Sequence, residues 1–249
     1  MTDLVYFGTS NRKLAKTRTA TFLIPSGHTC PGANECLSKF DRAKNKIVDG
    51  KNQEFRCYMA SQEAAFPSVR RSADKNLAKL KAAKSELAIA ELLHDSLPGN
   101  FWKSIRIHSG GDFFNAAYFK AWCRVANRNP ERLFYAYTKS LPLWIANKDC
   151  IPRNLVLTAS VGGKWDSLIS QHDLKYAVVV YHPDVASKLT LEVDHDDSLA
   201  RDPDVKAFAL LLHGVQKAGS EASEAIKRLK KEAVKFSYGK PSAHSVHES

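Results

Sequence analysis

Short runs of apolar residues alternate with amphipathic stretches along most of the chain. The runs are rich in Val, Ile, Leu and aromatic residues and lie at 19–25, 104–109, 133–138, 154–160, 176–182, 189–197 and 208–214. Buried strands separated by helices are typical of parallel βαβ units, in which helices cover the sheet. About seven strands approach the eight of a complete barrel, so the pattern predicts an α/β fold of the (β/α) TIM-like barrel kind, complete or incomplete. A doubly wound open sheet is the alternative.

Two helices are indicated outside this alternation. Apolar residues recur at helical spacing over 78–97, which predicts one amphipathic helix that ends at the breaker cluster from Leu97 to Asn100. Ser220 is placed to cap a second, C-terminal helix. We expect a single domain over residues 1–249, with a cysteine-containing insertion over 28–60 and a flexible polar tail over 240–249.

The composition is that of a basic globular domain. Lys and Arg number 37 against 26 Asp and Glu, which gives a formal charge of +11. Such an excess favours a polyanion, because basic side chains neutralise phosphates and release counterions, so a nucleic acid is the expected partner. A basic enzyme that does not bind nucleic acid is the alternative. The chain lacks an apolar run that could span a bilayer or direct secretion, so we expect a cytoplasmic protein without a membrane partner, of undetermined oligomeric state.

The densest candidate chemistry follows the run at 104–109, where a parallel barrel would place its active site. The segment consists of His108, Ser109, Gly110, Gly111, Asp112 and Phe113. Two glycines let backbone approach a ligand closely, and Asp112 presents a carboxylate beside them, as a nucleophile or base requires. Phe113 or Phe114 is the candidate for stacking on a base. The alternative is a tight turn in which Asp112 caps the helix that begins near Asn115.

A second group of carboxylates follows the run at 189–197. An extended chain would place Asp194 and Asp196 on one face, with His195 and Asp197 on the other. Two carboxylates on one face could bind a cation or divide the roles of acid and base. A solvated acidic loop is the alternative.

Three cysteines and a histidine lie in the expected insertion. Cys30, Cys36 and Cys57, with His28 nearby, offer thiolates and an imidazole, the ligands that tetrahedral zinc prefers. The same three thiolates could instead hold an iron–sulfur cluster. Their spacing is irregular and contains no Cys-x-x-Cys pair, so three ordinary buried thiols remain the alternative. The other two cysteines, at 123 and 150, have no evident ligand partner and are interpreted as structural.

Several linked segments resemble a family of tailed-phage proteins known as gene product eighty-eight. The segments are HTCPGANEC, RCYMASQEAAFPSVRRSADKNL, RIHSGGDFFNAAYFKAW, LFYAYTKSL and FALLLHGVQKAGSEASEAIKRL. The likeness runs from about His28 to Gly239. It implies an infected host cell as the setting. It further suggests a relation to phage DNA 7-deazaguanine transglycosylases, which are similar to the tRNA-guanine transglycosylases, zinc-bearing (β/α) barrels with an aspartate nucleophile and a second aspartate.

The resemblance implies an enzyme that exchanges guanine in DNA for a 7-deazaguanine base. An aspartate would attack the sugar carbon, and Asp112, Asp194 and Asp196 are the candidates. The base edge would contact His108 to Gly111, and Arg106 and Lys139 would contact phosphate. The chain departs from the tRNA enzymes in its N-terminal cysteines and in lacking their zinc spacing.

Two other functions are compatible with the same residues. A metal-dependent nuclease would hold magnesium on Asp112, Asp194 and Asp196. A non-catalytic DNA-binding protein would use a structural zinc and would lose no activity when Asp112 is replaced. Incorporation of a deazaguanine into DNA separates the three functions.

Overall fold

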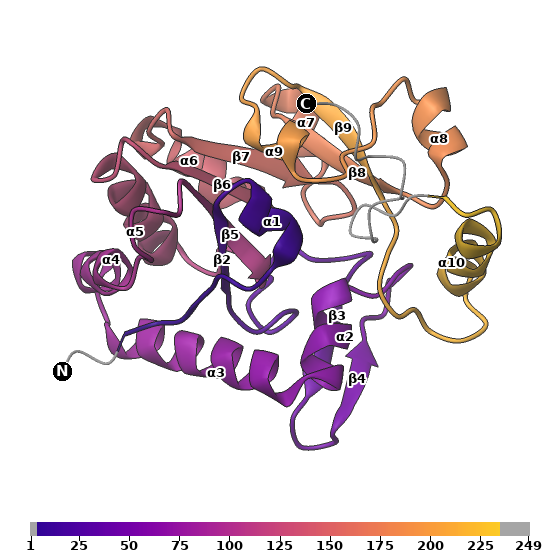
Figure 1. Ribbon diagram of the computed structural model, residues 1–249, viewed down its shortest axis with the longest axis horizontal. Helices are drawn as coiled ribbons and strands as arrows, with labels where there is room; N and C mark the ends of the chain where they lie inside the picture. The colour runs from indigo at the N-terminus through magenta and orange to yellow at the C-terminus, as the bar shows by residue number, and fades with distance from the viewer. Residues whose placement is uncertain (1–3, 235–249) are drawn as a thin grey trace.

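The computed structural model describes residues 4–234, and a seven-stranded sheet runs through its centre (Figure 1). Its strands are, in spatial order, β1 (Phe7–Gly8), β2 (Thr19–Leu23), β5 (Ser104–Gly110), β6 (Leu133–Thr138), β7 (Leu155–Ser160), β8 (Tyr176–Val180) and β9 (Ala207–Leu211). β1 is antiparallel to β2, and every other neighbouring pair is parallel. The predicted α/β class and parallel sheet are therefore present.

The sheet is open over the described residues, with β1 and β9 at its two edges. A closed TIM-like barrel is not shown. The six parallel strands follow one another in chain order, so the sheet also lacks the reversal of strand order that a doubly wound sheet requires. Successive right-handed crossovers in one direction place the connecting helices on one face. The strand order is that of a barrel opened along one side, which leaves the other face of the sheet available for a site.

Helices surround this sheet. Those described are α1 (Arg12–Lys16), α2 (Tyr58–Ala65), α3 (Pro67–Ala82), α4 (Glu86–Asp95), α5 (Ala116–Asn127), α6 (Leu141–Ala146), α7 (Ser167–Gln171), α8 (Pro183–Lys188), α9 (Ser198–Arg201) and α10 (Glu221–Lys231), with a 3-10 turn at Lys148–Cys150. The large core lies between the sheet and α4 and α5, where Phe22, Ile105 and Phe134 pack around Trp122 of α5. Burial of large aromatic side chains makes this face the main source of hydrophobic stabilisation.

The opposite face of the sheet has a smaller core. Tyr135 of β6, Val156 of β7 and Phe208 of β9 pack there with Ala200 of α9. Side chains alternate between the faces along a strand, so Tyr135 points away from the α5 side while its neighbour Phe134 points toward it. The short α9 covers only part of this face, and the candidate site occupies the remainder.

The sequence prediction of one helix over 78–97 is wrong. The chain forms two helices, because Lys84 adopts a left-handed conformation with φ +54° and Ser85 then caps α4, its Oγ accepting a hydrogen bond from the Ala88 N–H at 3.2 Å. A left-handed residue cannot continue a helix. Residues 189–197 are also not a strand, and they contribute only a bridge between Val193 and Ala209.

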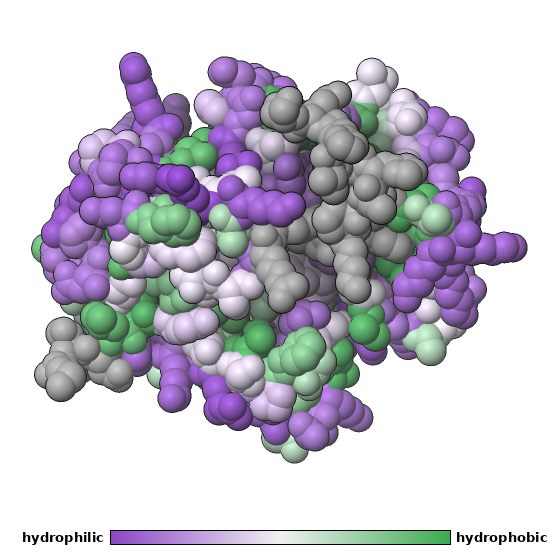
Figure 2. All heavy atoms as spheres, in the orientation of Figure 1, coloured by the Kyte–Doolittle hydropathy of each residue, from purple (hydrophilic) through white to green (hydrophobic). Residues whose placement is uncertain are grey.

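The expected insertion contains a β-hairpin, β3 (Ser38–Asp41) and β4 (Lys46–Asp49). The C-terminal helix is confirmed as α10, with the Ser220 Oγ accepting from the Ser223 N–H at 3.2 Å. The expected flexible tail over 240–249 lies outside the described residues. In the part of the chain that is described, helices are too short or too polar to cross a membrane. Figure 2 shows hydrophilic residues around the rim of one face and neutral or apolar residues nearer its centre.

Candidate functional site

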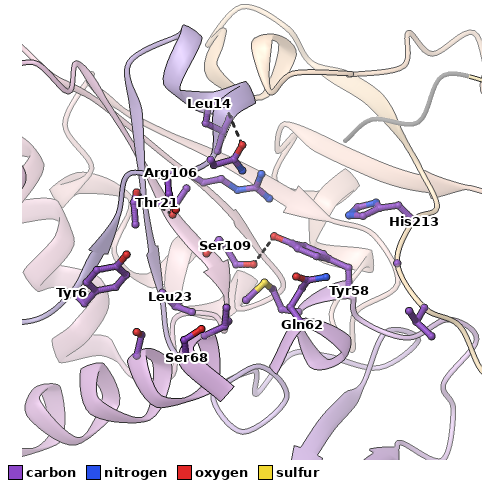
Figure 3. Close-up of a pocket in the computed structure, with 18 of the residues that line it drawn as sticks. Tyr6, Leu14, Thr21, Leu23, Tyr58, Gln62, Ser68, Arg106, Ser109 and His213 are labelled. Carbon is purple, nitrogen blue, oxygen red and sulfur yellow. Dashed lines mark hydrogen bonds between the residues drawn. The ribbon is translucent and has the colours of Figure 1, made fainter. Parts of the chain in front are cut away.

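Two adjacent hollows lie where the parallel strands end. The inner one has a volume of about 180 Å³ and is lined by residues that follow β5, β6, β7 and β9. The outer one is a wider cleft of about 770 Å³ that extends toward β1, α3 and α10. Both are lined by Tyr58, Arg106, Ser109 and His213, and Figure 3 shows these side chains converging on the outer cleft. The two hollows therefore form one candidate site at the edge where parallel sheets hold ligands.

Asp112 lines the inner hollow, as the sequence predicts. Its Oδ1 accepts hydrogen bonds from the Phe113 N–H at 2.7 Å and the Thr138 hydroxyl at 2.6 Å, and its Oδ2 accepts from the Lys139 N–H at 2.8 Å. Burial raises the pKa of this carboxyl to about 6, although the three hydrogen bonds act in the opposite direction. Asp112 thus joins the end of β5 to the end of β6 and faces a cavity.

Asp112 does not cap α5. The N-cap of this helix is Asn115, whose Oδ1 accepts from the Tyr118 N–H at 2.9 Å. The capping alternative for Asp112 is therefore wrong.

Packing of the chain on itself requires glycine at 111, and it leaves little space beside Gly110. Gly111 has φ +85°, and a Cβ there would lie 2.3 Å from Ile24 Cγ1 and 2.6 Å from Thr29 Oγ1. A Cβ at Gly110 would lie 3.1 Å from Met59 Cγ. The glycines bring the end of β5 against the segment that follows β2, which carries the cysteines.

His108 lies at the bottom of the inner hollow in a left-handed conformation, with φ +66°. Its Nε2 pairs with the Tyr118 hydroxyl at 3.0 Å, and its ring meets that of Phe113 edge to face. Burial lowers the pKa of His108 to about 3, so the imidazole is neutral near pH 7. Its Nδ1 is buried and has no hydrogen-bond partner among the described residues.

Phe113 is fully buried in the large core, where it packs against Tyr118 and Phe119. It has no exposed surface on which an extruded base could stack. The stacking prediction is therefore wrong for this residue, because the chain turns Phe113 toward α5 while Asp112 faces the cavity.

The two cations predicted to contact phosphate are both occupied within the protein. Arg106 lines both hollows, and its Nη1 pairs with Asp197 Oδ2 at 2.8 Å. Lys139 is buried, and its Nζ donates to the carbonyl oxygens of Ser160 at 2.8 Å and Val161 at 2.5 Å. Arg106 and Lys139 therefore add positive charge within the site, and neither is presented on a surface that would bind DNA phosphates.

The three predicted thiols meet at the inner hollow. Cys30, Cys36 and Cys57 all line it and are not in disulfides. Burial raises the pKa of each thiol, that of Cys57 to about 12, and the neighbouring Cys36 raises the pKa of Cys30 and of Cys57 further. His28 is different, since it is exposed and its ring pairs with the Phe40 carbonyl at 3.0 Å. Within residues 4–234, no three His, Cys, Asp or Glu side chains are placed to hold a single metal ion.

Asp194 and Asp196 do not line either hollow. The buried Asp194 carboxylate accepts hydrogen bonds from the N–H groups of Asp196 at 3.1 Å and Ala200 at 3.0 Å, and the exposed Asp196 accepts from Ser198 at 3.1 Å. These bonds shape the loop that leads into α9. The predicted common face of the two carboxylates is wrong, because the chain here is a turn and not an extended strand. The described residues therefore give a magnesium-dependent nuclease no cluster of three carboxylates.

Three further residues belong to the site; Tyr58 was not predicted, whereas Asp197 and His213 lie at the ends of apolar runs, where site residues are expected. Tyr58 donates its hydroxyl proton to the Ser109 carbonyl at 2.7 Å, and its ring lies 4.8 Å from that of His213 (Figure 3). Asp197 anchors Arg106. A signal for Tyr58 was its position directly after Cys57, and for His213 its position directly after the last apolar run. Asp197 belongs to the acidic group singled out in the sequence, but its pairing with Arg106 was not predictable, because it depends on a left-handed turn at φ +65°.

The fold and site define a class: an α/β protein with an open, mostly parallel sheet and a cavity at the strand ends that is lined by thiols and a buried carboxylate. Residues 5–231 match the family model described as gene product 88, and the chain belongs to this family. It is 34% identical over 118 residues to the gene 88 protein of Mycobacterium phage L5, a match that covers 47% of this chain and 46% of the phage protein. The matched segment thus spans about half the length of that relative. No solved structure matches the chain.

Proposed function

We propose that this chain is a DNA-modifying enzyme of an infected host cell that exchanges guanine for a 7-deazaguanine base. The observation that carries the proposal is the placement of Asp112 in the inner hollow with a pKa raised to about 6 by burial. A carboxyl of this kind is ionised near pH 7 yet poorly solvated, which favours its attack on an electron-poor sugar carbon.

The proposed step balances without a further reactant. Asp112 Oδ2 forms a bond to the sugar carbon as the bond from that carbon to guanine breaks. The incoming deazaguanine then attacks the same carbon, which releases the carboxylate. The proton lost by the incoming base equals the proton taken up by the released guanine. Oδ2 accepts a hydrogen bond from the Lys139 N–H at 2.8 Å, and a carboxylate oxygen has a further lone pair for this role.

The surroundings supply what such a reaction requires. The inner hollow of about 180 Å³ opens beside a cleft of about 770 Å³, so a base and its attached sugar have separate spaces. The exposed Lys230 of α10 lines the cleft, and the formal charge of +11 favours a polyanion. Extrusion of a base into a small cavity is the usual route by which an enzyme reaches an atom within a duplex.

The test is expression of the chain in a host that supplies a 7-deazaguanine, followed by digestion of plasmid DNA to nucleosides and mass spectrometry. The proposal expects the deazaguanine nucleoside with the wild-type chain and background levels with Asp112→Asn. Asp196→Asn is the matched control, because this exposed carboxylate lies outside both hollows, and it should retain the wild-type level. Unmodified DNA from folded wild-type protein would overturn the proposal. Binding of DNA by wild type and Asp112→Asn alike, without modification, would indicate a non-catalytic DNA-binding protein.

A further inference from the structure

We infer that Cys30, Cys36 and Cys57 hold an iron–sulfur cluster with one iron left without a thiolate, open to the inner hollow, and that a ligand carrying both an amine and a carboxylate binds at this iron. The inference rests on side chains around the cavity and does not use the base-exchange reaction; the two compete, because both assign Asp112 Oδ2 in the inner hollow.

The three thiols come from different segments and converge on one cavity. Cys30 and Cys36 lie in the segment between β2 and β3, and Cys57 is the N-cap residue of α2. All three line the same hollow of about 180 Å³, which places them near one another. Three partly buried thiols that share a cavity form a donor set for a metal cofactor, since metal binding stabilises the thiolate form.

The number and type of the donors suit a cluster. Zinc binds thiolate sulfur at about 2.3 Å, so its ligands must crowd around one point. In residues 4–234 the side chains are not placed for a single ion, although the three thiols line the same cavity. A cluster of several irons and sulfides is larger than one ion and is bound by thiolates that stand farther apart.

Backbone groups around the sulfurs support negative charge. The Gly27 N–H donates to Cys30 Sγ at 3.3 Å. The N–H groups of Met59 and Ala60, in the first turn of α2, lower the pKa of Cys57 against the effect of burial. Hydrogen bonds to thiolate sulfurs are a standard feature of protein-bound iron–sulfur clusters and tune their potential.

Three thiolates leave one iron of a four-iron cluster without a protein ligand. The cavity beside the thiols presents the carboxylate of Asp112 and the ammonium group of Lys139. Lys139 Nζ donates to two carbonyl oxygens, so one of its three protons remains for a ligand carboxylate. Asp112 Oδ2 can accept from a ligand amine. Opposite charges that line one small cavity complement an α-amino acid group, and the adjoining cleft has room for the rest of the molecule.

The cluster is tested by anaerobic reconstitution of the full chain with ferrous iron and sulfide. We expect about four irons and four sulfides per chain, visible absorbance, and an electron paramagnetic resonance signal after reduction. Mild oxidation should remove the iron that lacks a thiolate and give the signal of a three-iron cluster. Cys30→Ser, Cys36→Ser and Cys57→Ser should each lose most of the iron. Cys150→Ser is the matched control, because this exposed thiol lies outside the cavity, and it should keep wild-type iron.

Circular dichroism of each variant separates loss of the cluster from loss of the fold. If a serine variant does not fold, protection of the three thiols from alkylation in the reconstituted wild-type chain provides the same test. Uptake of one zinc in place of iron, or equal iron in folded triple-serine protein, would overturn the cluster. Since these measurements use no DNA, their outcome is separate from that of the base-exchange assay.

The ligand is tested with S-adenosylmethionine, which joins an amine and a carboxylate to a nucleoside. It should shift the signal of the reduced cluster, whereas methylthioadenosine, which lacks the amino acid group, should not. Lys139→Met should weaken the effect at least tenfold in ligand concentration while retaining the iron. An identical response to both compounds, or none to either, would overturn the amino acid assignment.

Discussion

Arg106 Nη1 lies 2.8 Å from Asp197 Oδ2, and this ion pair joins β5 to the turn before α9 across 91 positions of the chain. Both side chains are buried, with 8% and 2% of their surface exposed. The Tyr135 hydroxyl donates to the same Oδ2 at 2.8 Å, and the guanidinium lies 5.2 Å from the centre of the Tyr137 ring. The pair therefore fixes the loop of α9 against the face of the sheet that carries the site.

Asp197→Ala should lower the free energy of unfolding by about 3–5 kcal/mol, because it leaves the buried Arg106 charge without its partner. Urea unfolding followed by circular dichroism measures the change. Asp196→Ala is the control, since this neighbouring side chain is exposed and its loss should cost about 1 kcal/mol or less. Equal effects of the two substitutions would show that the ion pair does not stabilise the fold.

Gly111→Ala should destabilise the protein by about 2–5 kcal/mol, because the new Cβ would overlap Ile24 and Thr29 and the backbone has φ +85°. Gly219→Ala isolates the contribution of the backbone, since Gly219 has φ +76° and a Cβ there meets nothing within 4 Å. Its cost should be about 1 kcal/mol. Thermal unfolding of both variants compares the two losses of stability. A smaller loss for Gly111→Ala than for Gly219→Ala would contradict the packing described for the cysteine segment.

Asp112 should make stability depend on pH. Its pKa is about 6 in the folded protein and near 3.8 in the unfolded chain, so the folded state holds this proton more tightly. The resulting stabilisation is fully present below about pH 4, falls as pH rises toward 6, and amounts to about 3 kcal/mol. Lowering the pH should therefore raise the free energy of unfolding of wild type relative to that of Asp112→Asn. Asp196→Asn should show no comparable shift, and a constant difference for Asp112→Asn would contradict the raised pKa.

Continuous apolar runs made the parallel strands predictable, because a strand buried on both faces needs little else to identify it. β1 was missed since its two residues carry no periodicity. Helical spacing of apolar residues continues across Lys84, so the break there depends on a local left-handed turn that the pattern does not record. The apolar pattern also could not predict whether the sheet closes into a barrel, because tertiary packing decides whether the edge strands pair.

The candidate site shows the same division. The convergence of Asp112 with Cys30, Cys36 and Cys57 agrees with the candidates chosen from residue chemistry. The sequence could not predict that Asp194 lies outside the hollows that Asp112 lines, because the position of Asp194 depends on the course of the turn before α9. A residue type indicates what chemistry is available, but the turns decide which residues meet.

Cys123 and Cys150 should form a disulfide on mild oxidation. Their sulfur atoms lie 3.2 Å apart, which joins the buried thiol of α5 to an exposed thiol in the 3-10 turn before β7. Diamide would accept the two electrons and two protons that the thiols lose as the sulfur–sulfur bond forms. Mass spectrometry of the intact chain should show the loss of two hydrogen atoms, and peptide mapping should place the link between these residues.

Cys150→Ser should abolish this link and leave the other three cysteines reduced under the same treatment. The exposed position of Cys150 gives the oxidant access, whereas a thiol at Cys123 alone is buried and has a raised pKa. A link that instead joins Cys30, Cys36 or Cys57 would show that the thiols of the inner hollow react more readily than this pair. That result would contradict the assignment of Cys123 and Cys150 as the pair poised for oxidation.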